Sequence, residues 1–269
     1  MNDNDKGIEQ LLAIMTRLRN PDGGCPWDVE QTFSTIAPHT IEEAYEVADA
    51  IAEDDMPALK DELGDLLFQV VFHAEMASER GEFNFDDVVA NVSAKMIRRH
   101  PHVFGETSID SAEAQTHAWE DIKAEERMGK ARGKINDDDS ALAGVISALP
   151  ALVRAQKLQK RAARVGFDWP DAQQVLDKID EEIEEIKAEM TDNPDPARLE
   201  DEVGDLLFVC TNLARKLGLE AETALRQGNS KFERRFRHME AAAKAKGLEF
   251  SSLELAEMEK LWVQAKSTD

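Results

Sequence analysis

Cysteine is almost absent from this sequence, which carries only Cys25 and Cys210 among 269 residues. So few thiols cannot form a disulfide framework, and the acidic N-terminus lacks the basic start and apolar centre of a secretion signal. We therefore expect reduced thiols and a cytoplasmic location. No apolar run approaches the ~20 residues that a membrane-spanning helix needs, so no membrane partner is expected.

Positive charge is also scarce. The sequence has 32 Lys and Arg against 55 Asp and Glu, which gives a formal net charge of −23. Such a surface repels the phosphate backbone of nucleic acids, so no nucleic-acid partner is expected. An acidic protein can still bind a polyphosphate if a metal ion supplies the missing positive charge.

Sustained alternation of β-branched residues is missing as well, whereas apolar residues recur at helical spacing. One stripe runs from Leu176 to Met190 and another from Val203 to Leu217, and a turn rich in proline and aspartate separates them. In the first half, residues 41–47 and 59–68 correspond to these two segments, and EDDMPAL (53–59) takes the place of the turn. The pattern predicts an all-α fold.

The sequence contains an internal duplication. Residues 59–68 read LKDELGDLLF and residues 199–208 read LEDEVGDLLF, and Trp119 near the end of the first half corresponds to Trp262 in the second. A repeat of this length indicates two copies of one domain. We predict a first domain over residues 1–127, a linker over 128–147 and a second domain over 148–269.

Each copy carries two pairs of carboxylates, and each pair has members three residues apart. The first acidic cluster is Glu43, Glu46, Glu62 and Asp65, and the second acidic cluster is Glu182, Glu185, Glu202 and Asp205. Residues three apart share a helix face, so two antiparallel helices can bring both pairs together. A glycine inside each second helix, Gly64 or Gly204, costs about 1 kcal/mol relative to alanine and suggests close approach by another helix or a ligand.

Four carboxylates at one helix seam repel one another unless a cation neutralises them. Oxygen ligands without Cys or His favour Mg²⁺, Mn²⁺ or Ca²⁺ over zinc. The Glu-x-x-His pattern of di-iron bundles is absent, which argues against an oxidase. A solvated face of an acidic helix is the simpler interpretation of one copy, but the matched spacing in both favours a metal site.

Several segments together resemble a known family. The pattern EExxE, about sixteen residues, then ExxD occurs in both copies, and the flanking segments are GCPWDVEQT (24–32), RRHPHVF (98–104) and VGFDW (165–169). This combination resembles the tandem-domain MazG nucleoside triphosphate pyrophosphohydrolases over nearly the whole chain. The resemblance implies helical bundles assembled as a homodimer. It also implies Mg²⁺, with Mn²⁺ as a substitute, on the four carboxylates of each cluster, and cleavage of NTPs and dNTPs to the monophosphate and pyrophosphate.

The resemblance also suggests substrate residues in the second copy. The family pattern of Lys, Arg, KxxxR and a late Trp is met by Lys178, Arg198, Lys231, Arg235 and Trp262. Glu181, next to a predicted metal ligand, is a candidate for orienting or deprotonating the attacking water. The first copy has His39 and Ala58 in place of Lys178 and Arg198, so we expect residues 148–269 to be the main active domain.

Other functions fit parts of the pattern. A narrower dUTP or dCTP diphosphatase of the same superfamily would share the acidic clusters, and a substrate panel would distinguish it. A non-catalytic nucleotide or metal sensor would bind without releasing pyrophosphate, and a structural acidic bundle would bind no nucleotide. The sequence contains no GxxxxGK[ST] loop, so it does not support a P-loop NTPase.

Overall fold

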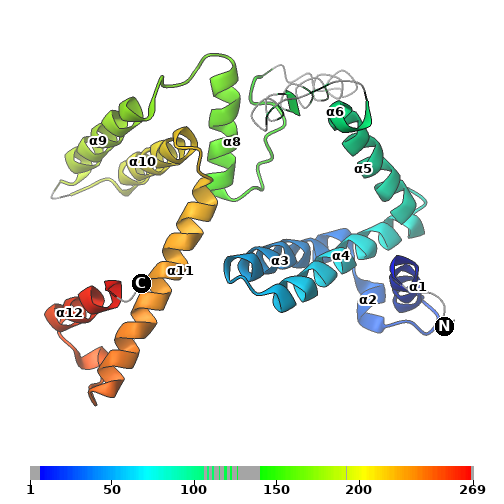
Figure 1. Ribbon diagram of the computed structural model, residues 1–269, viewed down its shortest axis with the longest axis horizontal. Helices are drawn as coiled ribbons and strands as arrows, with labels where there is room; N and C mark the ends of the chain where they lie inside the picture. Colours follow the sequence, from blue (N-terminus) through cyan, green and yellow to red (C-terminus); the bar gives the residue numbers. More distant parts are fainter. Residues whose placement is uncertain are drawn as a thin grey trace. The chain divides into compact units, whose positions relative to one another are not determined.

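A computed structural model describes residues 7–105, 140–191 and 193–267, together with the isolated positions 108, 111, 115, 118, 119, 122 and 126. Among these residues the regular secondary structure is helical without a strand, which confirms the all-α prediction. The chain divides into two compact units, residues 1–126 and 127–269 (Figure 1). Residues 128–139 of the predicted linker lie outside the described part of the chain.

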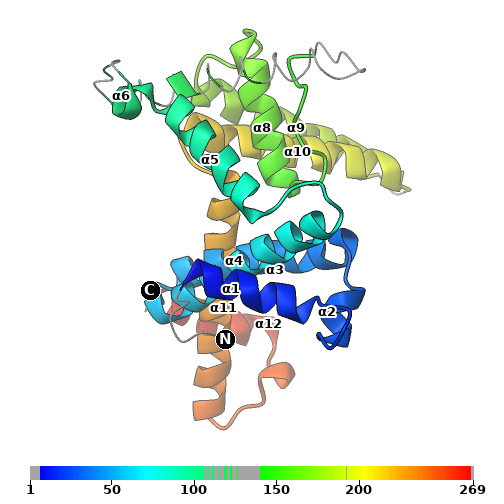
Figure 2. The same cartoon turned by 90° about the vertical axis from the view of Figure 1, so that its right-hand side faces the viewer.

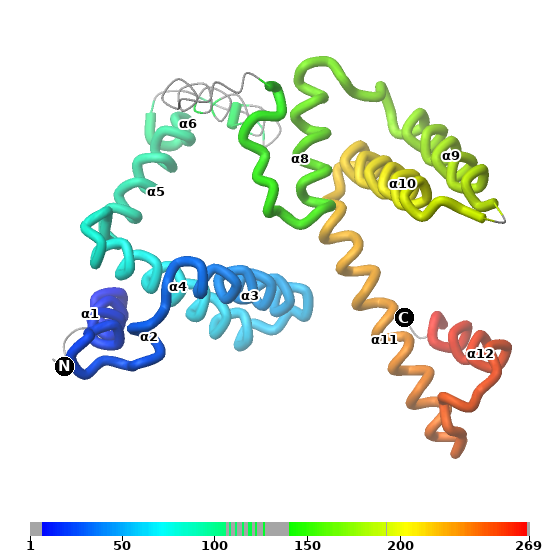
Figure 3. The backbone as a smooth tube through the Cα atoms, turned by 180° about the vertical axis from the view of Figure 1, so that it is seen from behind, coloured from blue at the N-terminus to red at the C-terminus, as the bar shows by residue number. Residues whose placement is uncertain are grey.

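The first unit is built around a helical hairpin. Its helices are α1 (Ile8–Leu18), α2 (Pro26–Glu30), α3 (Phe33–Ala52), α4 (Met56–Glu79), α5 (Phe85–Arg99) and α6 (Pro101–Phe104). Helices α3 and α4 lie antiparallel and side by side, and α1 packs on α4 (Figures 1 and 3). Thr32 caps α3 through a capping box with Thr35, and Asp55 caps α4 by accepting from the Ala58 amide. The two caps set the start of each helix and so the register of its carboxylates.

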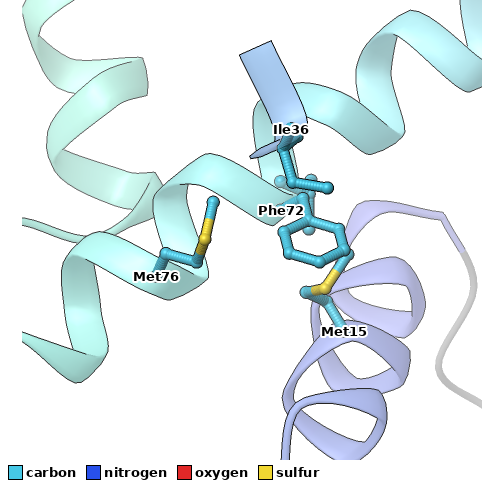
Figure 4. Packing of buried hydrophobic residues seen from close by; sticks show 5 residues of the cluster. Met15, Ile36, Phe72 and Met76 are labelled. Carbon is cyan, nitrogen blue, oxygen red and sulfur yellow. The ribbon is translucent and has the colours of Figure 1, made fainter. Parts of the chain in front are cut away.

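The core of the first unit lies at the end of this hairpin where α1 crosses it. Met15, Ile36, Val71, Phe72 and Met76 are buried together there (Figure 4). Fully burying a side chain of this size contributes about 1.5–3 kcal/mol. Arg19, after α1, holds the α2 segment in place because it donates to both Glu79 carboxylate oxygens, at 2.6 and 2.7 Å, and to the backbone oxygen of Asp28 at 2.5 Å.

The second unit repeats the hairpin. Its elements are α8 (Ala151–Arg164), α9 (Ala172–Glu189), α10 (Pro196–Lys216), α11 (Ala221–Ala245), the 3₁₀ turn η1 (Phe250–Ser252) and α12 (Leu255–Lys266). Helices α9 and α10 lie antiparallel, α8 packs on α10, and α12 folds back on the long α11 (Figures 1 and 2). Met239, Ala243, Leu261 and Ala265 form the buried core between α11 and α12.

The apolar stripe predicted along α10 is only partly covered in the single chain. Val203, Leu207 and Leu217 are 44%, 55% and 58% exposed, whereas Val209, Thr211 and Asn212 are buried. The helix was predicted well, but α8 and α9 cover only part of its apolar circumference. Among the described residues no helix has both the length and the apolar character to cross a membrane.

Candidate metal centres

The hairpin of the first unit brings carboxylates of both helices together. Ligand oxygens of Glu43 on α3 and of Glu62 and Asp65 on α4 all lie within 4.8 Å of one another. Glu46, predicted as the fourth member, lies outside this group of three, but its charge raises the pKa of both Glu43 and Glu62. The antiparallel packing of two i, i+3 pairs therefore produces the expected convergence.

The carboxylates of the first acidic cluster resist ionisation. Desolvation raises the pKa of Glu43 most, followed by the negative charges of Glu46 and Asp65. The pKa of Glu62 is raised by desolvation and then by the charges of Glu46 and Asp65. Both causes disfavour the anion, and a cation between the two helices would remove the second one. The carboxylates of the first acidic cluster therefore repel one another when no cation is bound between them.

The hairpin of the second unit forms a similar group. Ligand oxygens of Glu182, Glu185 and Glu202 lie within 4.8 Å of one another. Asp205, predicted as the fourth ligand, is exposed and lies outside that group. Glu182 is 3% exposed, and its Oε2 has no hydrogen-bond partner among the described residues. A buried carboxylate oxygen without a partner is costly, and a metal ion is one ligand that satisfies it.

A lysine lies on the second acidic cluster. Lys178 Nζ is 2.8 Å from Glu182 Oε1 and 2.9 Å from Glu181 Oε1. Hydrogen bonds to Glu182 and Glu181 raise the pKa of Lys178 well above its ordinary value. The pKa of Glu185 is raised by desolvation, although the Lys178 charge opposes that change. The lysine thus offsets part of the carboxylate repulsion.

The first unit has a weaker counterion at the matching position. His39 Nδ1 lies 3.4 Å from Glu42 Oε2, and both side chains are about half exposed or more. A histidine carries a full charge only below its pKa, whereas a lysine is charged throughout the neutral range.

Both groups of three fit a divalent cation. Each presents hard carboxylate oxygens from two helices within 4.8 Å of one another, which is the donor type preferred by Mg²⁺, Mn²⁺ and Ca²⁺. The unpartnered Glu182 Oε2 supports that fit in the second unit. Acidic groups of this kind can hold a metal.

The predicted substrate residues lie in two places. Arg198, one turn before Glu202 on α10, pairs with Glu189 Oε1 at 2.5 Å. The exposed Lys231 and the half-buried Arg235 are on α11, and the Arg235 guanidinium lies 5.6 Å from the ring centroid of Trp262 on α12. Trp262 also packs at 5.4 Å from the Phe232 ring, so one side of the indole belongs to the α11–α12 contact. Lys178 and Arg198 are thus on the hairpin that carries the acidic cluster, whereas Arg235 and Trp262 meet between α11 and α12 and Lys231 is exposed on α11.

The two helical glycines have free space beside them. A Cβ added at Gly64 or Gly204 would meet no heavy atom within 4 Å in the described chain. The expectation of close packing by another helix is therefore wrong within a single chain, and the space is open to a ligand or a second chain.

Sequence reasoning did not single out Gln69, which lies beside the first acidic cluster and is 7% exposed. A signal was available, because Gln69 follows Asp65 by four residues and so continues the acidic face of α4.

Comparisons with known proteins agree with the duplicated helical hairpin. The MazG nucleotide pyrophosphohydrolase domain matches the chain twice, over residues 31–104 and 171–240. The chain is 54% identical over 260 residues to the nucleoside triphosphate pyrophosphohydrolase of Escherichia coli (strain K12), a match that covers 96% of this chain and 97% of the relative. It is 43% identical over 262 residues to the nucleoside triphosphate pyrophosphohydrolase/pyrophosphatase MazG of Thermotoga maritima, covering 97% of this chain and 96% of that protein.

The domain matches span more than half of the chain, and both relatives align with it almost from end to end. The resemblance seen in the acidic motifs is therefore confirmed, and this chain belongs to the MazG family of nucleotide pyrophosphohydrolases.

Proposed function

We propose that this chain hydrolyses nucleoside triphosphates, both ribo- and deoxyribo-, to the monophosphate and pyrophosphate at the second acidic cluster, with Mg²⁺ as its cation. The observation that carries the proposal is the buried, unpartnered Glu182 Oε2 within 4.8 Å of ligand oxygens from Glu185 and Glu202. Asp205, one turn along α10 from Glu202, completes the ligand set when its exposed side chain turns toward the seam. Mn²⁺ has the same oxygen preference and can substitute.

Phosphoryl transfer depends chiefly on positioning and charge neutralisation. When bound, Mg²⁺ supplies charge withdrawal from the phosphate oxygens and polarisation of water. Lys178 is already next to the ligands, and its ammonium can move from Glu182 to a phosphate oxygen once a cation neutralises that carboxylate. Glu181 then loses its lysine partner and becomes free to orient or deprotonate the attacking water.

The remaining basic residues supply the rest of the substrate site in this proposal. Arg198 carries positive charge on α10 one turn before Glu202. Its side chain is 65% exposed, so its guanidinium can leave Glu189 and contact a phosphate instead. Lys231 and Arg235 bind phosphates from α11, and the half-buried Trp262 stacks on the nucleobase in this proposal. We further propose that residues 148–269 are the main active domain, because His39 and Ala58 replace Lys178 and Arg198 in the first copy.

The exposed apolar faces support a homodimer. Leu63 and Leu67 on α4 are 50% and 41% exposed, and Leu207 on α10 is 55% exposed, although both helices already pack against several helices of their own unit. A second copy that covered these faces would complete helical bundles and remove apolar surface from water. Sedimentation or light scattering of the whole chain measures this assembly directly.

The decisive experiment identifies the products formed from a panel of NTPs and dNTPs, including dUTP and dCTP, with Mg²⁺ and with excess chelator. Monophosphate plus pyrophosphate, lost on chelation and in Glu182→Gln, is the expected result. Glu200→Gln removes an exposed carboxylate of α10, the other helix of the hairpin, outside the cluster; it is the matched control and should retain activity. Diphosphate plus inorganic phosphate contradicts the proposal, and binding without turnover favours the nucleotide sensor.

A further inference from the structure

A buried amide borders the first acidic cluster. Gln69 is 7% exposed, and its Nε2 lies 3.5 Å from Glu43 Oε1, a long hydrogen bond between α4 and α3. Its Oε1 is buried and has no hydrogen-bond partner among the described residues. A buried amide oxygen without a partner is uncommon in native structures and calls for a physical reason.

The helix geometry places this amide on the acidic face of α4. Gln69 follows Asp65 by four residues and Glu62 by seven, so the three side chains stack on successive turns of one face. Two of them contribute ligand oxygens to the group formed with Glu43. Gln69 is therefore the next side chain along the same line, and its amide reaches the one ligand that comes from the opposite helix.

The duplicated copy shows that helix packing does not require an amide here. The residue that matches Gln69 in the second unit is Val209, which is 4% exposed. An apolar side chain thus fills the equivalent buried position, although the neighbouring carboxylates are the same. The two copies differ at the turn beside their clusters, and only the first carries a group able to contact a carboxylate or a cation.

We propose that Gln69 is a positioning residue of a divalent-cation site in the first unit. Without a cation, Nε2 donates to Glu43 and holds that carboxylate toward α4. The amide can serve a bound cation in two orientations. In one, Nε2 donates to Glu43 and holds that ligand in place; in the other, Oε1 faces the cation and adds a hard oxygen to the ligand set. This inference rests on the metal-binding part of the proposed function and extends it to a residue absent from the second copy.

The test measures Mn²⁺ affinity by calorimetric titration and electron paramagnetic resonance in the whole chain. A parent with Glu182→Gln and Glu202→Gln retains only the first cluster. Gln69→Met in that parent keeps the side-chain size and removes the amide, and it should weaken Mn²⁺ binding about 10-fold, the lower end of the effect of losing an outer-shell partner. Gln69→Val, which introduces the residue of the second copy, should weaken it similarly.

A matched control uses the equivalent position. In a parent with Glu43→Gln and Glu62→Gln, Val209→Met introduces the same residue beside the second cluster without removing an amide, so Mn²⁺ affinity there should stay within twofold. Thermal unfolding of every variant without metal measures any structural role separately. Unchanged Mn²⁺ affinity in a folded Gln69→Met or Gln69→Val variant overturns the proposal, because the amide would then be only a core group.

The failure of this inference is distinguishable from failure of the proposed function. If the first-cluster parent binds no Mn²⁺ while the unmodified chain still releases pyrophosphate, the Gln69 site is excluded and the hydrolase activity stands. If Mn²⁺ binds and depends on Gln69 but no pyrophosphate forms, the site stands and the proposed reaction is wrong.

Discussion

The two acidic hairpins carry the same carboxylates at the same spacing but differ in the groups around them. In the second unit Lys178 contacts Glu182 and Glu181, and Val209 lies one turn beyond Asp205. In the first unit the corresponding residues are His39, which is 3.4 Å from Glu42, and Gln69, which contacts Glu43. One copy thus has a built-in cation at its cluster, whereas the other has a polar neighbour and unrelieved repulsion.

This difference suits the two copies to different tasks, one to binding a metal together with an anionic ligand and the other to binding a metal alone. A cluster with its own lysine is partly neutralised before any metal binds, so metal competes with that lysine, and the released ammonium can contact an anionic ligand. A cluster without the lysine gains more from a bare cation. We therefore expect the second unit to combine metal with triphosphate and the first to bind metal in its own right.

The largest expected effect comes from comparing equivalent predicted ligands of the two clusters. Glu202→Gln should lower pyrophosphate release at least about 100-fold, equivalent to about 2.7 kcal/mol of transition-state stabilisation. Glu62→Gln in the first unit should leave the rate within about threefold of the unmodified chain. Steady-state kinetics with saturating Mg²⁺ measure both. Equal losses in the two variants would mean that both copies take part in turnover.

The next test removes the lysine. Lys178→Met should tighten Mn²⁺ binding at the second cluster without nucleotide about 10-fold, because the metal no longer competes with an ammonium 2.8 Å from Glu182. The same change should lower turnover about 10-fold, since the phosphates lose a cation. Lys187→Met, which removes a lysine paired with the exposed Glu184, is the control and should change neither quantity. Weaker metal binding in Lys178→Met would show that the lysine supports the ligand geometry.

A third test asks whether the helices themselves differ. Thr32 caps α3 and Asp171 caps α9, each by accepting from a backbone amide three residues later, at 3.3 and 3.0 Å. Thr32→Ala and Asp171→Ala should each cost about 1 kcal/mol of stability. Chemical denaturation of the whole chain measures this. A much larger loss in only one variant would place part of the difference between the copies in helix stability.

The smallest expected effect is a pH dependence of the metal-free chain. The pKa values of Glu43 and Glu62 are raised in the folded state, so between their unfolded and folded pKa values the folded chain binds more protons. Their contribution to stability is therefore present below the unfolded pKa of 4.5 and is lost as pH rises through the raised values. With chelator, Glu43→Gln should raise the melting temperature at pH 7 by about 2 °C.

Thermal unfolding between pH 4 and 8 measures this effect, and saturating Mg²⁺ should remove it. Glu185→Gln should have a weaker effect, because the Lys178 charge opposes the rise in the pKa of that carboxyl. A melting temperature of Glu43→Gln that matches the unmodified chain at every pH would show that the repulsion is already relieved by solvent.

Much of the fold follows from local patterns. The two hairpins begin at capping residues and proline-containing turns, and helical spacing fixes which carboxylates share a face, so their convergence could be predicted from Glu43, Glu62 and Asp65. Which helix faces are covered by a neighbouring helix could not be predicted from the sequence. The α10 stripe around Leu207 is half exposed, because periodicity identifies an apolar face without saying which neighbour covers it.

The sequence by itself determined the all-α class, the duplication, the family and the two acidic clusters, because each depends on spacing within one helix or on repeated motifs. Only the tertiary structure decided which groups neutralise those clusters. Lys178 contacts neighbours on its own helix. Contacts between helices, in contrast, decide the burial of Glu182, the position of Gln69 against Glu43 and the placement of Trp262 on Phe232. Such contacts are set by helix rotation and crossing, which the spacing of residues along one chain does not specify.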